Sequence, residues 1–241
     1  MIPYINATKL QGELMKQLFL MTIFTFTLFA QEVTVSIMPQ KTFVEKIAGD
    51  KIKVNVMVKP GFSPATYEPK TSQMKKLATS DLYFSVGVAF EEVWIKRFKS
   101  ANRDLKVIDT SVGIEKQEIA EHGHHEEHED EKHEEHKEHG AEEHHDEHHD
   151  EHEEAVHHEE GLDPHIWLDP VLVKVQAKNI YEALVKIDNV NRDFYTANYE
   201  KFLGELDSLD KEIQKLLINN KNQTFMVFHP SWGYFAKRYK L

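Results

Sequence analysis

Residues 32–58, "EVTVSIMPQKTFVEKIAGDKIKVNVMV", contain the pattern of a β-strand, a helix and a second β-strand. The two ends of this stretch, residues 32–38 and 51–58, are rich in valine and isoleucine and predict strands. Between them, residues 41–49 place their apolar side chains at helical spacing and predict a helix. Because a crossover helix joins parallel strands, the stretch predicts a βαβ unit.

The alternation of strands and helices continues to residue 110. Helices are predicted at residues 71–79 and 90–98, and strands at residues 81–87 and 105–110. Strands that alternate with helices predict an α/β fold with a parallel sheet covered by helices on both faces. In such folds, ligands bind beyond the carboxyl ends of the strands.

Two longer helices are predicted in the second half of the chain, at residues 171–187 and 191–218. At 1.5 Å per residue the second helix would be roughly 42 Å long, which suits a rigid connection between two lobes. Beyond it, residues 224–229 predict a buried strand, and the following "PSWGYFAKRY" predicts a helix with Pro230 near its first turn.

These elements predict an organisation in two lobes. We expect an N-terminal α/β lobe over residues 31–190, a linker helix over residues 191–218 and the start of a second α/β lobe over residues 219–241. Because one strand and one helix cannot bury a sheet, the second lobe is expected to be incomplete in this chain.

The first thirty residues predict a secretory signal peptide. Lys16 precedes an apolar run at residues 18–30 that is too short to span a bilayer but suits a signal sequence, and Met15 is an alternative start. The chain has no cysteine, so it has neither disulfides nor a thiol for lipid attachment, and any metal site must use histidine, carboxylates or water. We therefore expect a periplasmic protein.

An acidic, histidine-rich tract at residues 121–160 dominates the charge of the chain. The tract holds nineteen acidic residues and two lysines, so its own net charge is −17. The whole chain has a formal net charge of −12, and the residues outside the tract therefore carry +5. With so few apolar residues the tract predicts a disordered loop. Basic residues elsewhere are scattered and form no cluster with aromatics, which argues against nucleic-acid binding.

Fourteen of the sixteen histidines lie in this tract. Several are four residues apart, so a helical turn would place two imidazoles on one face, and the surrounding carboxylates attract divalent cations. We interpret the tract as a weak, multi-site metal collector; the alternative is a solvated acidic spacer. Its histidines are His122, His124, His125, His128, His133, His136, His139, His144, His145, His148, His149, His152, His157 and His158.

The other two histidines, His165 and His229, are candidate metal ligands. His165 lies in "DPHIWLDP", between two prolines that restrict the backbone and reduce the entropy lost on coordination. His229 ends the predicted strand at residues 224–229, where a ligand crevice is expected in an α/β fold. Either histidine could instead have only a structural role, as a helix cap or a hydrogen-bonding partner, but the pair favours a metal-binding cleft.

Four segments carry a resemblance to a known family: "VKPGFSPATYEPKTSQMKKL", "GLDPHIWLDP", "YTANYEKFLGELDSLD" and "FMVFHPSWGYFAKRY". In this order, with an intervening histidine-rich insertion, they resemble the periplasmic zinc-binding proteins of ABC transporters. The resemblance covers residues 31–241. It implies two α/β lobes joined by one rigid helix, with a metal ion between them held by three histidines and often a carboxylate or water.

The resemblance assigns His165 and His229 to the second and third of these histidines. The position of the first is occupied by Ala65, which cannot bind metal, so a water, a carboxylate or a tract histidine would have to complete the site. Glu68 is the nearest carboxylate in the sequence. Neutral imidazoles suit Zn²⁺, Cu²⁺ and Ni²⁺, whereas a Mn²⁺ site would be richer in carboxylates; we expect zinc.

The resemblance therefore implies a periplasmic, monomeric zinc-binding protein that delivers its ion to an inner-membrane ABC permease. The alternative is a periplasmic zinc buffer or metallochaperone that acts through the histidine-rich tract. A zinc enzyme is not expected, because no general base or nucleophile motif accompanies His165 and His229.

Overall fold

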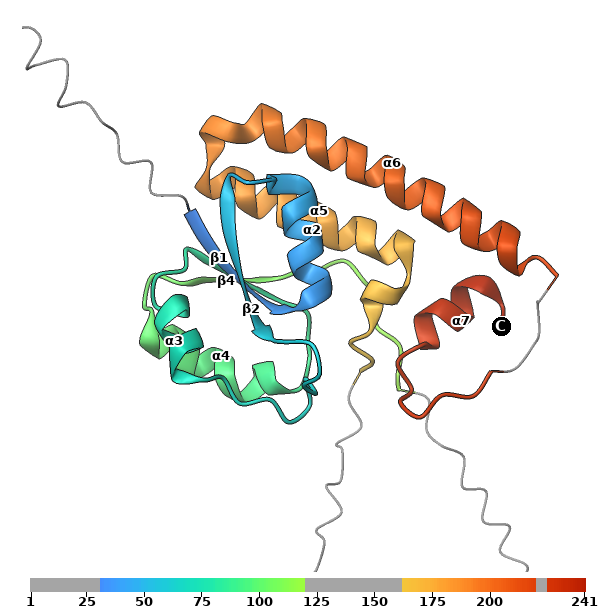
Figure 1. The fold of residues 1–241 in the computed structure, drawn as a ribbon, viewed down its shortest axis with the longest axis horizontal. Coiled ribbons are helices and arrows are strands. Elements are labelled where there is room, and N and C mark those ends of the chain that lie inside the picture. Colours follow the sequence, from blue (N-terminus) through green and yellow to red (C-terminus); the bar gives the residue numbers. More distant parts are fainter. Residues whose placement is uncertain (1–30, 120–161, 220–224) are drawn as a thin grey trace, which may run out of the picture.

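The fold is built on one parallel sheet, seen in a computed structural model that describes residues 31–119, 162–219 and 225–241 (Figure 1). The predicted signal peptide and the histidine-rich tract lie outside these residues. The four strands are ordered β2-β1-β3-β4, and all three neighbouring pairs are parallel. Their bounds are β1 Gln31–Ile37, β2 Ile52–Val58, β3 Leu82–Ser85 and β4 Lys106–Asp109.

The first βαβ unit forms as its sequence pattern predicts. Helix α2, Met38–Ala48, connects β1 to β2, and the two strands pair with Val33 opposite Val54 and Val35 opposite Val56. Val33 and Val35 are buried on one face of β1, and Thr34 and Ser36 are buried on the other, as expected for a strand covered on both faces. The predicted parallel α/β fold is confirmed for this lobe.

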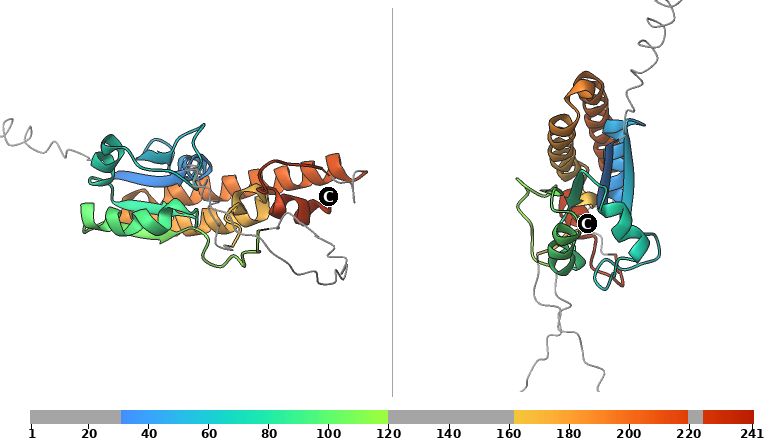
Figure 2. Two further views of the ribbon diagram at one scale, coloured as in Figure 1. Left: turned by 90° about the horizontal axis from the view of Figure 1, so that it is seen from below. Right: turned by 90° about the vertical axis from the view of Figure 1, so that its left-hand side faces the viewer.

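Helices cover both faces of the sheet (Figures 1 and 2). Two hydrophobic clusters lie on the two faces of the sheet, and successive side chains of β3 point into one or the other. Phe84 packs with α2, α5 and α6 on one face, and Tyr83 packs with α3 and α4 on the other. The helices of the first group, besides α2, are α5 Pro170–Ile187 and α6 Arg192–Leu217, and those of the second are α3 Thr71–Leu77 and α4 Phe90–Ala101.

Helices α5 and α6 form a hairpin that covers the sheet and then extends past it (Figure 2). They are joined by the short 3₁₀ helix η2, Asn189–Asn191, and Tyr195 donates a hydrogen bond to Asp188 across this turn at 2.6 Å. Helix α7, Gly233–Tyr239, lies beside the far half of α6. Helix α6 has nearly the bounds that the sequence predicts, while its role as a linker between two lobes stays a prediction. None of the described helices is both long and apolar enough to cross a membrane.

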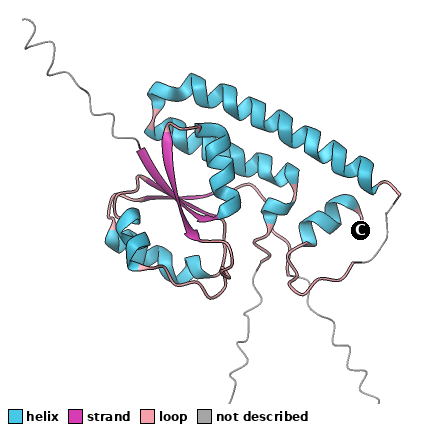
Figure 3. Ribbon diagram, viewed as in Figure 1, coloured by secondary structure: helices cyan, strands magenta, loops and turns pink. Residues whose placement is uncertain are grey.

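The prediction of a buried strand at residues 224–229 is wrong for the residues described. Residues 225–229 have no regular secondary structure, and Met226 and Phe228 are fully exposed (Figure 3). A strand needs a neighbour that receives its backbone hydrogen bonds, and none of the described strands adjoins this segment. The helix after Pro230 also starts later than predicted, at Gly233, because His229 and Ser231 form a tight turn with a 2.7 Å backbone hydrogen bond.

Replacing Ile180 tests the core between the sheet and α5. Ile180 is fully buried, so Ile180→Ala should lower the free energy of unfolding by about 2–5 kcal/mol, through lost burial and the cavity left behind. Ile218→Ala is the matched control, because Ile218 is 58% exposed and its loss should change stability by less than about 0.5 kcal/mol. Denaturant unfolding followed by circular dichroism measures both, and equal effects would contradict this view of the core.

Candidate metal site

The segment that carries His165 is fixed at both ends. Leu162 forms an antiparallel bridge with Glu118, and the next residue donates a backbone hydrogen bond to Gln117 at 2.8 Å. On the other side, the 3₁₀ helix η1, Ile166–Leu168, buries Ile166 completely in the cluster under α3 and α4. His165 is therefore held between a backbone bridge and a core anchor.

Asp163 orients the imidazole of His165. Its Oδ1 accepts hydrogen bonds from the backbone N–H of His165 at 2.9 Å and from Nδ1 at 2.6 Å. Asp163 is only 1% exposed, and its second oxygen lies 3.4 Å from the amide nitrogen of Gln117. Because a carboxylate only accepts hydrogen bonds, a neutral His165 carries its proton on Nδ1 and keeps the Nε2 lone pair for a metal ion. This is the hydrogen-bonding pattern that metal-binding histidines commonly show.

His229, in the segment before α7, lies next to Nε2 of His165. The Nε2 atoms of His165 and His229 are 3.1 Å apart, and the ring planes are inclined by 75°. Two nitrogens that bind one tetrahedral zinc ion at about 2.0–2.1 Å lie roughly 3.3 Å from each other. The ring of Trp167 lies 5.0 Å from that of His165 and forms an apolar wall. The pair therefore fits two ligand positions of a zinc ion.

The other predicted site residues lie in the loop after β2. Ala65 and Glu68 are both exposed, while Tyr67 between them is buried in the same cluster as Ile166. The structure thus brings His165 and His229 together and places Ala65 and Glu68 beyond the carboxyl end of β2. Within the described ranges, no three histidine or carboxylate side chains form a group that could hold a metal ion. The tract histidines lie outside these ranges.

Residues 33–241 match the protein family described as "ZnuA: Zinc-uptake complex component A periplasmic". The chain belongs to this family. It is 30% identical over 205 residues to the high-affinity zinc uptake system protein ZnuA of Bacillus subtilis, and 36% identical over 201 residues to that of Paracoccus denitrificans. These matches cover 84% and 82% of the chain but 56% and 60% of the two relatives, so the chain spans little more than half of their length.

Solved structures of family members have the same fold. A crystal structure of ZnuA matches with a TM-score of 0.68 at 38% identity, covering 88% of this chain and 68% of the solved one. A ZnuA deletion mutant with zinc bound matches with a TM-score of 0.69 at 37% identity, with the same coverage. The described lobe therefore has the α/β fold of these solved structures, of which the chain covers about two thirds, and the family is one of zinc-uptake components.

Sequence reasoning missed Glu91, a buried carboxylate near the carboxyl ends of β1 and β3. Glu91 is 3% exposed and accepts hydrogen bonds from the backbone N–H groups of Val86 at 3.0 Å and Gly87 at 2.7 Å, and from the hydroxyl of Ser36. Burial raises the pKa of its carboxyl group. A signal existed, because Glu91 falls at helical spacing on the same face as Trp94 and Phe98. In this family member, Glu91 closes the turn after β3.

Asp163→Asn tests how the tautomer of His165 is set. In the unchanged metal-free protein, the ¹⁵N shifts of the neutral His165 ring should report a proton on Nδ1. An asparagine amide can donate as well as accept, so the variant should gain the Nε2–H form. Asp207→Asn, at a 54% exposed side chain on α6, should leave the spectrum unchanged. A dominant Nε2–H form in the unchanged protein would overturn this assignment.

Proposed function

We propose that this protein is the zinc-capturing component of an ABC metal importer, which binds Zn²⁺ between its lobes in the periplasm and delivers it to an inner-membrane permease. The observation that carries the proposal is the pair of Nε2 atoms 3.1 Å apart, one of them on a ring oriented by a buried carboxylate. Membership of the zinc-uptake family supports the same function.

His165 and His229 would bind the transported ion as neutral imidazoles. The hydrogen bond to Asp163 fixes the direction of the His165 lone pair. Both rings must be deprotonated to bind, so affinity should fall as acid protonates them. Nitrogen donors favour zinc over manganese, although a relative named manganese-binding lipoprotein MntA, from Halalkalibacterium halodurans, is 25% identical to the chain over 198 residues.

Two imidazoles leave part of a four-coordinate zinc shell to other groups. A water, Glu68 or a histidine of the tract at residues 121–160 would complete it, because Ala65 stands where the family pattern has a histidine. We further propose that the tract collects zinc weakly near the cleft. The buffer or metallochaperone function remains the alternative if the tract holds all of the bound zinc.

Zinc titration in competition with a chelator tests the leading proposal, using residues 31–241 with and without residues 121–160. We expect one tight site to survive the deletion and to be lost in His165→Ala and in His229→Ala, because each change removes a ligand from the pair. The number of weakly bound ions should fall when the tract is deleted.

Two results would count against these assignments. If all zinc binding disappears with the tract, the chain acts as a zinc buffer and the histidine pair does not form a transport site. If the number of bound ions is unchanged by the deletion, the tract does not collect zinc. Circular dichroism of each variant confirms that the α/β lobe is still folded.

Ala65→His should strengthen zinc binding at the tight site, because it restores an imidazole at the position where the family pattern has one. Thr66→His is the matched control: it adds the same side chain to the neighbouring exposed position, where the family pattern expects no ligand. The same competition titration measures both variants. Equal gains would mean that an added imidazole acts anywhere on this loop, and no gain in Ala65→His would exclude position 65 from the site.

A further inference from the structure

We infer that Arg238, on α7, is a positioning residue that holds His229 against His165. The inference rests on the proposed function only for its consequence in metal binding, because the contacts themselves belong to the metal-free protein. Helix α7 is fastened at one end beside Asp163 and at the other end to α6 and the start of α5, and Arg238 makes the ionic attachment.

The N-terminal end of α7 is attached beside Asp163. Tyr234 is 5% exposed; its hydroxyl donates to the backbone carbonyl of Asp163 at 2.8 Å and accepts from the N–H of Gln117 at 3.1 Å. Gly233 approaches the same groups so closely that a Cβ atom there would lie 2.5 Å from the Gln117 amide and 3.2 Å from Asp163 Oδ2. A larger residue here would have to displace the side chain of Gln117.

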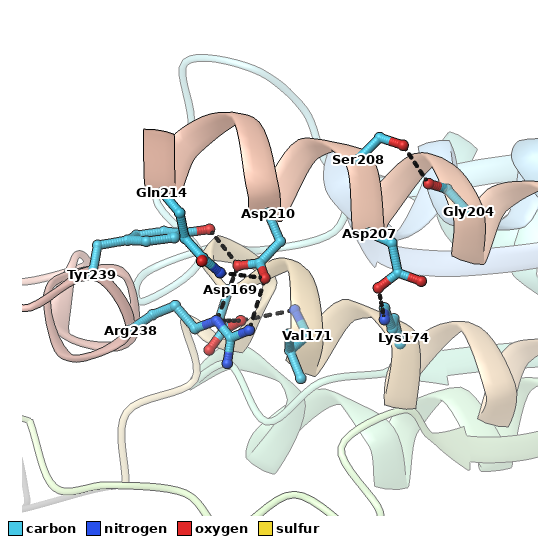
Figure 4. Close-up of polar contacts among 10 residues, drawn as sticks. All are labelled: Asp169, Val171, Lys174, Gly204, Asp207, Ser208, Asp210, Gln214, Arg238 and Tyr239. Carbon is cyan, nitrogen blue, oxygen red and sulfur yellow. Dashed lines mark hydrogen bonds and ion pairs between the residues drawn. The ribbon is translucent and has the colours of Figure 1, made fainter. Parts of the chain in front are cut away.

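The C-terminal end of α7 is attached to α6 through Arg238 (Figure 4). Its Nε and Nη2 atoms donate to the two oxygens of Asp210 at 3.1 and 2.9 Å, and Tyr239 donates to the same carboxylate at 3.1 Å. Nε also lies 3.6 Å from Asp169, which caps the N-terminus of α5 through a 2.8 Å hydrogen bond with Val171. Arg238 thus connects α7 to α6 and to the start of α5.

The charges make this attachment stronger than an ordinary surface ion pair. The side chain of Asp210 is 12% exposed and that of Asp169 is 11% exposed, so loss of Arg238 would leave two poorly hydrated carboxylates without their cation. The hydrogen bonds from Arg238 lower the pKa of Asp210, and those with Asp210 raise the pKa of Arg238. Both groups are therefore held in their charged forms.

Only three residues separate His229 from the first residue of α7. One of them is Pro230, whose ring fixes a backbone angle, and Ser231 closes a tight turn onto the carbonyl of His229 at 2.7 Å. A shift or rotation of α7 is consequently passed on to the imidazole of His229. In the segment before His229, the side chains of Met226 and Phe228 are fully exposed.

The test compares Arg238→Met with Arg238→Lys and with Lys174→Met in the full chain. Lys174 pairs with Asp207 between α5 and α6, so its loss removes an ion pair of the same helices without touching α7 (Figure 4). The first readout is the imidazole NMR signals of His165 and His229 in the metal-free protein, assigned with His165→Ala and His229→Ala. The second is zinc affinity by chelator competition, measured where circular dichroism shows every variant folded.

We expect Arg238→Met to shift the His229 signals and to weaken zinc binding by about tenfold, the lower end of the effect of removing an outer-shell partner. Arg238→Lys should recover part of the affinity, because lysine keeps the charge but not the two-pronged geometry. Lys174→Met should change neither readout. Unchanged His229 signals in Arg238→Met would overturn the inference, as would equal shifts in Lys174→Met. Zinc binding that never depends on His165 would instead refute the proposed function, while the metal-free spectra would still decide the role of Arg238.

Discussion

The carboxylate of Asp163 is almost completely shielded from water, and a charge in that position is tolerated only if hydrogen bonds replace its hydration. Those bonds come from His165 and Gln117, while the Asp163 backbone is bound by Gln117 and Tyr234. One buried group therefore fixes three segments that are distant in the sequence. The direction of the His165 lone pair follows from this requirement, since turning the ring would remove one of the few hydrogen bonds to the buried carboxylate.

The parts of the fold that depend on local pattern were predictable from the sequence. The strands and helices up to residue 110, and the helices α5 and α6, follow from apolar spacing and agree within a few residues. The strand at residues 224–229 failed because its apolar run says nothing about whether a neighbouring strand is present. The fold class and the pairing of His165 with His229 came from spacing and family resemblance. The roles of Asp163 and Glu91 depend on contacts that are made only after folding.

The ionic groups along α6 show why burial, and not the count of ion pairs, decides what a charge contributes. Lys174 and Asp207 meet where the aspartate side chain is 54% exposed, so water can replace either partner at little cost. Asp210 lies one helical turn further along, where its side chain is 12% exposed and bonded by Arg238, Tyr239 and Gln214. The first pair is a surface contact, whereas the second defines where another helix must lie.

The bridge between Glu118 and Leu162 has a consequence for how much the length of the chain between them can change. It brings the two ends of a 43-residue connection, residues 119–161, to adjacent backbone positions. The entropy of closing a loop rises only slowly with its length, by about 0.6 kcal/mol for each doubling, so the folded lobe hardly senses how many residues lie between these ends. Insertion or deletion of residues between Glu118 and Leu162 should therefore cost the lobe that carries His165 little stability.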